Sequence, residues 1–158
     1  MEKFGIGQPV TRVEDQRFTR GAGTYIEDVS LDNETVGVFV RSPHAHARIV
    51  EINKDSINKL PGILAVYSGE DLRMDNIGDI PCGAEINNID GTPCVKPRRP
   101  ALAIDRVRHL GDAVALIVAE TKQQALDAAD QLWIDYEPLD VAVETENSLS
   151  GEAPQIWD

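Results

Sequence analysis

The chain has 158 residues, which is enough for one domain of ordinary size with its own core. Fifteen Lys and Arg residues against 27 Asp and Glu residues give a net charge of −12, which argues against nucleic acid as a partner, because binding a phosphate backbone needs a clustered positive surface. Hydrophobic residues at 42% and charged residues at 27% are near the averages for soluble proteins, and no apolar run approaches the ~20 residues that cross a bilayer.

Residues 1–30 are expected to form an extended arm. They contain four glycines (Gly5, Gly7, Gly21 and Gly23) and show neither a two-residue nor a 3.6-residue period. Such an arm has little apolar area to offset the entropy of ordering its backbone, so it would be ordered only against another surface. The opening sequence MEKFGIGQPV lacks the long apolar core of a signal peptide, and a cytoplasmic location is therefore predicted.

From Thr35 onward the sequence has the pattern of a folded domain. Clusters of β-branched and aromatic residues lie on both sides of Pro43, and the two strands that they predict are candidates for pairing. The expected elements in chain order are strands at 36–40 and 49–52, a short helix from Asp55 or Ser56 to about Lys59, a strand at 63–67 and one helical turn at 69–72 behind Ser68.

Residues 73–100 lack a clear period and contain seven Gly and Pro residues, so they are expected to form a long irregular excursion. Loops of this length in a compact domain are functional, form an interface or are disordered. The sequence leaves these three alternatives open.

The strongest local signal is the apolar run Ala113–Ala119, which predicts a central strand buried on both faces. Thr121 and Gln124 then form a T-x-x-Q capping box, and small apolar residues at helical spacing predict a helix at 122–132. A final strand is expected at 133–136. This order of elements predicts an α+β fold with a mixed sheet and helices packed on one side.

Histidines and cysteines are the candidate metal ligands. His44 and His46 are two residues apart, which in an extended segment places both rings on the same side. Zinc or iron needs a further ligand, and His109 is the one other histidine, so rings bonded to backbone or to a neighbouring subunit are favoured over a metal pair. For Cys82 and Cys94, two free thiols are favoured over a local disulfide, and both over a metal or catalytic role.

The other polar motifs do not have the pattern of an active site. Adjacent carboxylates are expected to be solvated, because a catalytic pair needs enclosure and a set separation. A glycine motif lacks the flanking strand and helix of a nucleotide site, two serines lack evident Asp and His partners, and a basic KPRRP stretch favours a solvated loop. The residues concerned are Glu27–Asp28, Glu70–Asp71, Gly21–Gly23, Ser42, Ser68, and Lys96 with Arg98 and Arg99. No catalytic, cofactor-binding or metal-binding residue is predicted.

One series of segments carries a family resemblance, and RSPHAHARI, at Arg41–Ile49, is the most distinctive of them. The segments are Arg20–Asp28, Phe39–Ile49, Leu60–Ile63, Gly69–Leu72, Val107–Ala115, Ala119–Thr121, Ala125–Ala129, Asp135–Leu139 and Ala153–Asp158. In this order they resemble the a/b hammerhead domain, the first domain in the molybdopterin-binding large subunits of the xanthine dehydrogenase, aldehyde oxidase and aerobic carbon monoxide dehydrogenase family. The split-subunit organisation of carbon monoxide dehydrogenase is the nearer match, because the sequence begins directly with the large-subunit start.

The resemblance implies an oxidoreductase in which molybdenum on a pterin dithiolene, often as the cytosine dinucleotide, oxidises the substrate with oxygen derived from water. Electrons would leave through a [2Fe-2S] subunit to an FAD subunit. Family substrates include aldehydes, N-heterocycles and carbon monoxide. The cofactor-contacting segments and the catalytic glutamate of the family would lie in domains after Asp158, so this segment is expected to hold no cofactor.

The expected domain plan is an arm at 1–30, a hammerhead-like domain at 31–146 and a linker at 147–158 toward a catalytic domain. The favoured function is a structural and assembly domain, inactive alone, that packs against the remaining molybdopterin-binding domains, the iron–sulfur subunit and the FAD subunit, with no nucleic acid and no membrane segment. The chain would be either a fragment or a separately encoded subunit. The alternatives are a stand-alone binding module that retains the fold, and a small hydrolase or metal enzyme, which would need His44, His46 or Cys82 to assemble a site.

Overall fold

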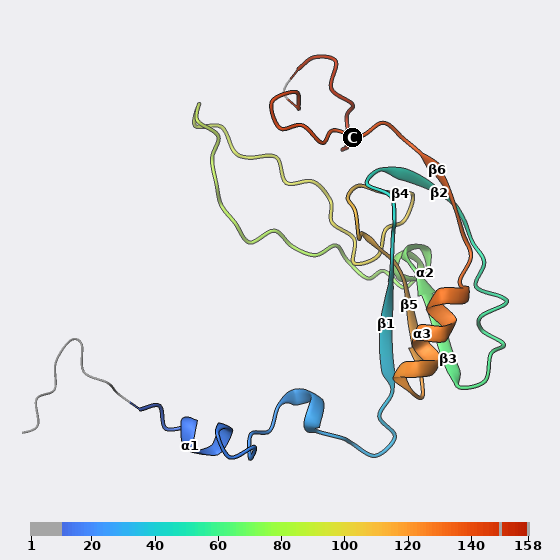
Figure 1. The fold of residues 1–158 in the computed structure, drawn as a ribbon. Helices are drawn as coiled ribbons and strands as arrows, with labels where there is room; N and C mark the ends of the chain where they lie inside the picture. Colours follow the sequence, from blue (N-terminus) through green and yellow to red (C-terminus); the bar gives the residue numbers. More distant parts are fainter. Residues whose placement is uncertain (1–10, 149, 158) are drawn as a thin grey trace, which may run out of the picture. The chain divides into compact units, whose positions relative to one another are not determined.

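The computed structural model describes residues 11–148 and 150–157, apart from the side chain of Glu27. The first part of the predicted arm, with Gly5 and Gly7, and the last residue of the terminal motif, Asp158, lie outside the described residues. The chain divides into two compact units between Glu34 and Thr35 (Figure 1).

The first unit contains two short helical turns, α1 (Asp15–Phe18) and the 3-10 helix η1 (Ile26–Asp28), so it is not extended throughout as predicted. Side chains favour these turns locally: the Asp28 carboxylate accepts a hydrogen bond from the Tyr25 backbone N–H at 2.9 Å. Gly21, at φ 68°, reverses the chain after α1. None of the described side chains of this unit is buried, which agrees with the small apolar area that the sequence offers.

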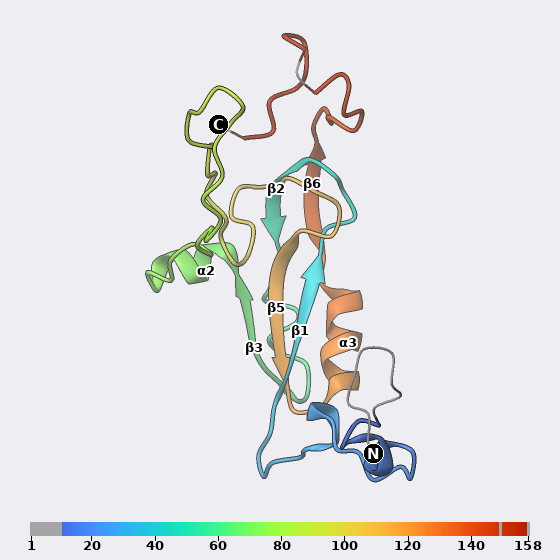
Figure 2. The same ribbon diagram turned by 90° about the vertical axis from the view of Figure 1, so that its left-hand side faces the viewer.

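In the second unit the strands form two three-stranded antiparallel sheets (Figures 1 and 2). The first has the order β1 (Val36–Arg41), β5 (Ala113–Ala119) and β3 (Ile63–Ser68). The second has the order β4 (Arg106–Val107), β2 (Ala47–Ile52) and β6 (Ile134–Pro138), which lists the remaining described strands.

Strand β5 is the centre of the first sheet, as predicted from its apolar run. Ala115, Ile117 and Ala119 on one face are fully buried in the main core cluster. Val114, on the opposite face, is fully buried in a second cluster with the neighbouring Ala103 and Val107. The strand is therefore covered on both faces where it begins, which explains the absence of a polar residue along it.

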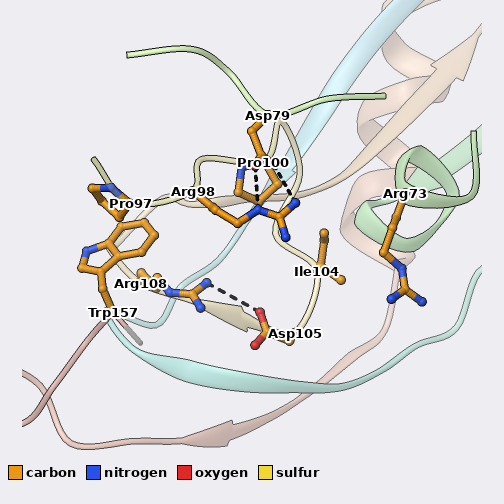
Figure 3. A pocket seen from close by; sticks show the side chains of 9 residues that line it. All are labelled: Arg73, Asp79, Pro97, Arg98, Pro100, Ile104, Asp105, Arg108 and Trp157. Atoms are coloured by element: carbon orange, nitrogen blue, oxygen red, sulfur yellow. Dashed lines mark hydrogen bonds and ion pairs between the residues drawn. The ribbon is translucent and has the colours of Figure 1, made fainter. Parts of the chain in front are cut away.

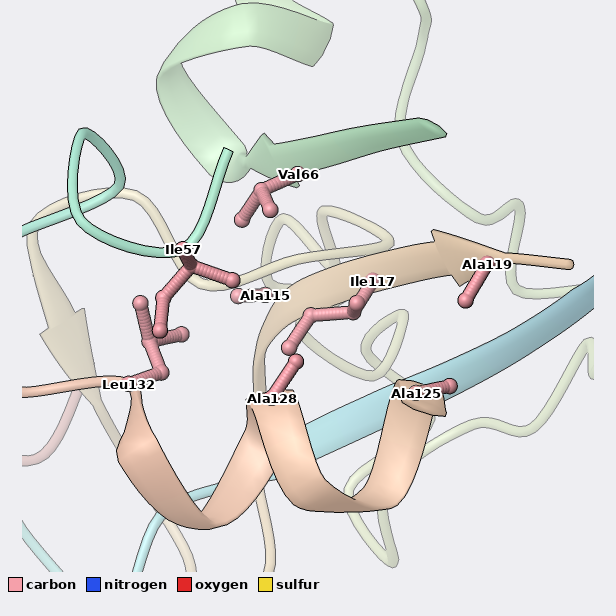
Figure 4. Packing of buried hydrophobic residues seen from close by; sticks show 8 residues of the cluster. All are labelled: Ile57, Val66, Ala115, Ile117, Ala119, Ala125, Ala128 and Leu132. Carbon is pink, nitrogen blue, oxygen red and sulfur yellow. The ribbon is translucent and has the colours of Figure 1, made fainter. Parts of the chain in front are cut away.

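Helix α3 (Lys122–Gln131) confirms the predicted helix and packs on the first sheet. Thr121 caps it, because the Thr121 hydroxyl oxygen accepts a hydrogen bond from the Gln124 backbone N–H at 3.3 Å. Small side chains on the inner face allow the helix to approach the strands closely (Figure 4). The buried cluster consists of Ile57, Val66, Ala115, Ile117, Ala119, Ala125, Ala128 and Leu132.

The α+β class is confirmed, but the predicted single sheet is divided. Strands β1 and β2 do not pair with each other, because the segment between them bends and β2 pairs with β4 and β6 instead. β5 also has both of its edges occupied, by β1 and β3, so it offers no edge to β2.

The predicted short helix at 55–59 is wrong, since this segment forms turns that end at Pro61 and Gly62. Two backbone N–H groups, of Ile57 and Asn58, share the Lys54 carbonyl oxygen. A segment this short gains too few helical hydrogen bonds to offset nucleation, and burial of Ile57 fixes the turn instead. The turn expected behind Ser68 is confirmed as α2 (Gly69–Met74).

The irregular excursion after α2 doubles back on itself as two limbs that project from the sheets (Figures 1 and 2). Backbone hydrogen bonds join the limbs at Ile80 with Arg99 (2.7 Å), at Cys94 with Ile86 (3.1 Å) and at Asn88 with Thr92 (2.8 Å). The returning limb leads into β4, and this arrangement builds the surface described next.

Candidate functional site

The most distinctive surface of the second unit is a basic groove formed by two adjoining hollows. The hollows measure about 380 Å³ and about 350 Å³ and share Pro97, Pro100, Arg108 and Trp157. Figure 3 shows the residues that line the first hollow. Their linings contain seven of the chain's 15 basic residues but only three of its 27 acidic residues. The basic ones are Arg41, Arg73, Lys96, Arg98, Arg99, Arg106 and Arg108, and the acidic ones are Asp79, Asp105 and Asp112.

Strand alternation around β4 supplies two of these arginines. Val107 is fully buried in the second core cluster, and the period of two places its neighbours Arg106 and Arg108 on the other side, where they line the groove. The floor is formed by Ala103 and Ala113, and the Ala103 N–H donates to the Ala113 carbonyl at 2.7 Å. The groove is thus fixed to the core.

Arg108 is the most enclosed cation of the groove, with a side chain only 13% exposed. Its Nε donates to the Ile156 carbonyl oxygen at 3.3 Å, and its guanidinium carbon lies 4.8 Å from the centre of the Trp157 ring. A cation over an aromatic face gains roughly 0.5–2 kcal/mol, depending on desolvation. Asp105 lies 3.6 Å from Arg108 on the other side (Figure 3). The groove therefore already holds a peptide segment, residues 156–157, by its carbonyl and its ring.

Cations elsewhere in the groove differ in how their charge is balanced. Arg98 forms two hydrogen bonds with Asp79, at 2.7 and 3.4 Å, and this carboxylate raises the pKa of Arg98. Among the described residues no carboxylate forms an ion pair with Arg41, Lys96 or Arg99. Arg41 instead donates to the Gly111 carbonyl oxygen at 2.9 Å. The groove keeps positive charge that an anionic group can use.

The three predicted histidine candidates do not come together. His46 is buried, and its Nδ1 lies 2.7 Å from the Asp140 carbonyl oxygen; because a carbonyl only accepts, Nδ1 carries the proton. The His44 ring instead lies 5.0 Å from the Tyr136 ring, and His109 is exposed beside Asp112. The segment that carries His44 and His46 bends, so the extended geometry expected from their spacing is wrong.

Burial around this motif leaves two polar atoms without a partner among the described residues, His46 Nε2 and the Tyr136 hydroxyl. Burial also raises the pKa of the Tyr136 hydroxyl. His46 has the backbone-bonded role that the sequence favours. It joins the start of β2 to the chain that follows β6.

The cysteines and serines do not form part of a catalytic arrangement among the described residues. Cys82 and Cys94 are both exposed and free. The Ser42 hydroxyl accepts from the His44 N–H at 3.0 Å and donates to the His44 carbonyl at 3.1 Å, which closes a turn. Ser68 begins α2, and its hydroxyl donates to Asp71 at 2.6 Å. Both serines stabilise the fold.

Asp71 departs from the prediction of a solvated acid pair. Lys54 Nζ lies 2.8 and 2.5 Å from its two carboxylate oxygens. Burial raises the pKa of Asp71, but the hydrogen bonds from Lys54 and Ser68 together outweigh it and lower the pKa below the ordinary value. Lys54 is 17 residues away in the chain, so adjacency of Glu70 and Asp71 gave no sign of this contact.

The structure also bears on metal and membrane sites. Across residues 11–148 and 150–157, no three His, Cys, Asp or Glu side chains are grouped so that they could hold a metal ion. The helices in these same ranges are too short or too polar to cross a membrane.

The groove itself was missed from sequence. KPRRP was correctly expected to be exposed, but the chain brings Arg41 and Trp157 to it from distant positions. The available signal was the crowding of five basic residues into 96–108 of an acidic chain.

Comparison with known proteins gives a consistent result. The family model of the aldehyde oxidase and xanthine dehydrogenase a/b hammerhead domain matches residues 20–140. The carbon monoxide dehydrogenase large chain of Afipia carboxidovorans is 37% identical over 96% of this chain and 17% of its own length. The nicotine 6-hydroxylase large subunit of Paenarthrobacter nicotinovorans is 34% identical over 92% of this chain and 17% of its own length.

A solved structure of reconstituted CO dehydrogenase from Oligotropha carboxidovorans superposes with a TM-score of 0.81 at 37% identity, over 95% of this chain and 17% of that one. The chain thus spans about a sixth of the length of these relatives. It belongs to the a/b hammerhead domain family of aldehyde oxidases and xanthine dehydrogenases.

Proposed function

We propose that this chain serves as the N-terminal structural and assembly domain of a molybdenum hydroxylase large subunit, an oxidoreductase of the xanthine dehydrogenase and carbon monoxide dehydrogenase type. One observation carries the proposal: the similarity covers 96% of this chain but only 17% of the carbon monoxide dehydrogenase large chain. The chain would contribute a folded domain to a larger enzyme and would be inactive alone.

The described residues do not fit the molybdenum centre. They group no set of three metal-ligating side chains, and both hollows of the basic groove are open to solvent, with more cations than carboxylates in each lining. We propose that the molybdopterin, as the cytosine dinucleotide, is bound by the remaining domains of the large subunit, with the [2Fe-2S] cluster and the FAD on partner subunits. No reaction step is derived through this chain.

Exposed apolar side chains support a role in packing. The excursion carries five that are more than half exposed, and a run of this kind on one loop is typical of a surface that is covered in an assembly. They are Ile77 (56%), Ile80 (57%), Ile86 (65%), Ile89 (110%) and Val95 (83%). The arm at 1–30 and the linker at 147–158 would likewise contact neighbouring domains, in a cytoplasmic enzyme.

Co-expression tests this proposal. A tagged form of the chain is produced with the remaining large-subunit domains and the two partner subunits, and is also produced alone. We expect molybdenum, measured by mass spectrometry, and hydroxylase turnover only in the co-purified assembly. Stoichiometric molybdenum and turnover with the isolated chain would refute the proposal, and failure of the remaining domains to co-purify would favour a stand-alone binding module.

A further inference from the structure

We infer that the basic groove is a docking site for an extended acidic peptide segment of another subunit. The inference rests on the proposed function, because that function gives the domain partner chains to bind. It assigns a specific surface and a specific partner chemistry that membership of the family does not supply.

Charge is the first argument. The whole chain carries a net charge of −12, yet nearly half of its basic residues line this one groove. Arg41, Lys96 and Arg99 have no carboxylate partner among the described residues. A concave surface of net positive charge on a protein of net negative charge attracts anionic ligands and orients them as they approach.

Shape and existing contacts indicate a peptide. Arg108 binds the backbone carbonyl of Ile156 and stacks on the ring of Trp157, so the groove already accepts the two groups that a polypeptide offers (Figure 3). Pro97 and Pro100 form a wall without a free backbone N–H on the side of the returning limb. The groove offers a backbone-binding arginine next to an apolar wall.

The positions of the cations in the groove favour a peptide with several carboxylate side chains over a ligand with a single phosphate group. A phosphate site concentrates donors on a single cluster of oxygens, commonly with several backbone N–H groups. Here the cations that have no carboxylate partner among the described residues come from separate places: Arg41 ends β1, whereas Lys96 and Arg99 lie on the returning limb. Side chains of an extended peptide that share one face recur every second residue, roughly 7 Å apart, so successive acidic side chains can meet cations that come from separate segments of the groove.

Trp157 provides a direct signal for binding. The chain has two tryptophans, so a Trp133→Phe background leaves Trp157, in the groove, as the one tryptophan fluorophore. The probe is an acetylated hexapeptide in which Glu alternates with Ser, and the same peptide with Lys in place of Glu is the charge control. We expect saturable quenching by the Glu peptide only, with a Kd that rises with salt.

Charge reversal tests the groove against the rest of the surface. Lys96→Glu with Arg99→Glu is expected to raise the Kd about tenfold or more, because two attractions become repulsions. Lys59→Glu with Lys122→Glu makes the same charge change at exposed sites that line neither hollow and should leave the Kd unchanged. Circular dichroism melts check the fold, and glutamine replaces glutamate at both groove positions if the reversed form unfolds.

Three results would overturn the inference. Equal Kd values for the groove and control variants would show that Lys96 and Arg99 do not contribute to binding of the peptide. Complete displacement of the peptide by micromolar inorganic phosphate would assign the groove to a phosphate ligand. In the co-expressed assembly, normal co-purification of the groove variant would refute the docking site but leave the proposed function intact. Failure of the unsubstituted protein to assemble would refute the proposed function, and the peptide titration would then decide whether the groove binds an acidic peptide.

Discussion

Gly69 is the position at which one added methyl group should be felt most directly. It is buried at the start of α2, and a Cβ atom there would lie 2.4 Å from the Ala103 carbonyl oxygen and 2.7 Å from that of Leu102. Both obstructing atoms are backbone, so rotation of a side chain cannot relieve the contact. Restoring an ordinary contact of 3.4 Å to Ala103 requires a backbone movement of about 1 Å.

Two effects of Gly69→Ala oppose each other. Alanine gains up to about 1 kcal/mol over glycine from helix propensity, and less at the first helical position, whereas overpacking a buried site typically costs about 1–3 kcal/mol. The obstruction is by backbone, so the packing cost should win, with a net loss of about 1–3 kcal/mol in the free energy of unfolding.

Urea denaturation followed by circular dichroism measures this loss as a lower midpoint at an unchanged slope. Gly78→Ala is the matched control, because a Cβ there meets nothing within 4 Å, and its stability should change by no more than about 0.5 kcal/mol. A Gly69→Ala protein at least as stable as the unsubstituted chain would show that α2 and residues 102–103 are not in this contact.

The remaining predictions concern the cap, the core and an ion pair. Thr121→Ala should cost about 0.5–2 kcal/mol in urea melts, while Thr121→Ser should retain most of the stability. Ile117→Ala should lower the free energy of unfolding by about 2–5 kcal/mol, whereas Leu126→Ala should lower it by about 0.5 kcal/mol because Leu126 is 40% exposed. Equal losses would contradict the assignment of Ile117 to the core. The pKa of Asp71 is lowered on folding, so ionised Asp71 stabilises the folded state. This contribution to the free energy of unfolding is complete above the ordinary pKa of 3.8 and is lost as the pH falls through the lower folded value. Asp71→Asn should therefore flatten the dependence of the urea midpoint on pH between 6 and 2, and an unchanged acid limb would argue against the contact with Lys54.

The elements that could be predicted from sequence are those whose signal is local. Strand β5 could be predicted because burial on both faces produces a continuous apolar run. Helix α3 could be predicted because its apolar residues have helical spacing behind the Thr121 cap, a pattern contained within about ten residues. The short turn at 55–59 has no such pattern. Its form is decided by the burial of Ile57 against α3 and β5, a contact that depends on the completed fold.

Sheet partners and the basic groove are non-local and could not be read in this way. The pairing of β2 with β4 depends on a two-residue strand that no periodicity reveals. Arg41, Arg108 and Trp157 come together only because the excursion returns beside β4 and the last described residues fold back over it. The His44 and His46 spacing was misleading for a related reason, since a bend between two strands separates rings that an extended segment would align.

The groove and the core are mechanically linked through β4, and this link determines how variants should be interpreted. Val107 points into the second core cluster, while Arg106 and Arg108 beside it line the groove. A change at Val107 or Gly69 would displace the groove floor as well as reduce stability, so lost assembly in such a variant would not identify a contact surface. Lys96 and Arg99 are exposed on the returning limb and contribute nothing to either core cluster. Loss of binding without loss of stability at these two positions is therefore the result that separates recognition by the groove from the integrity of the domain.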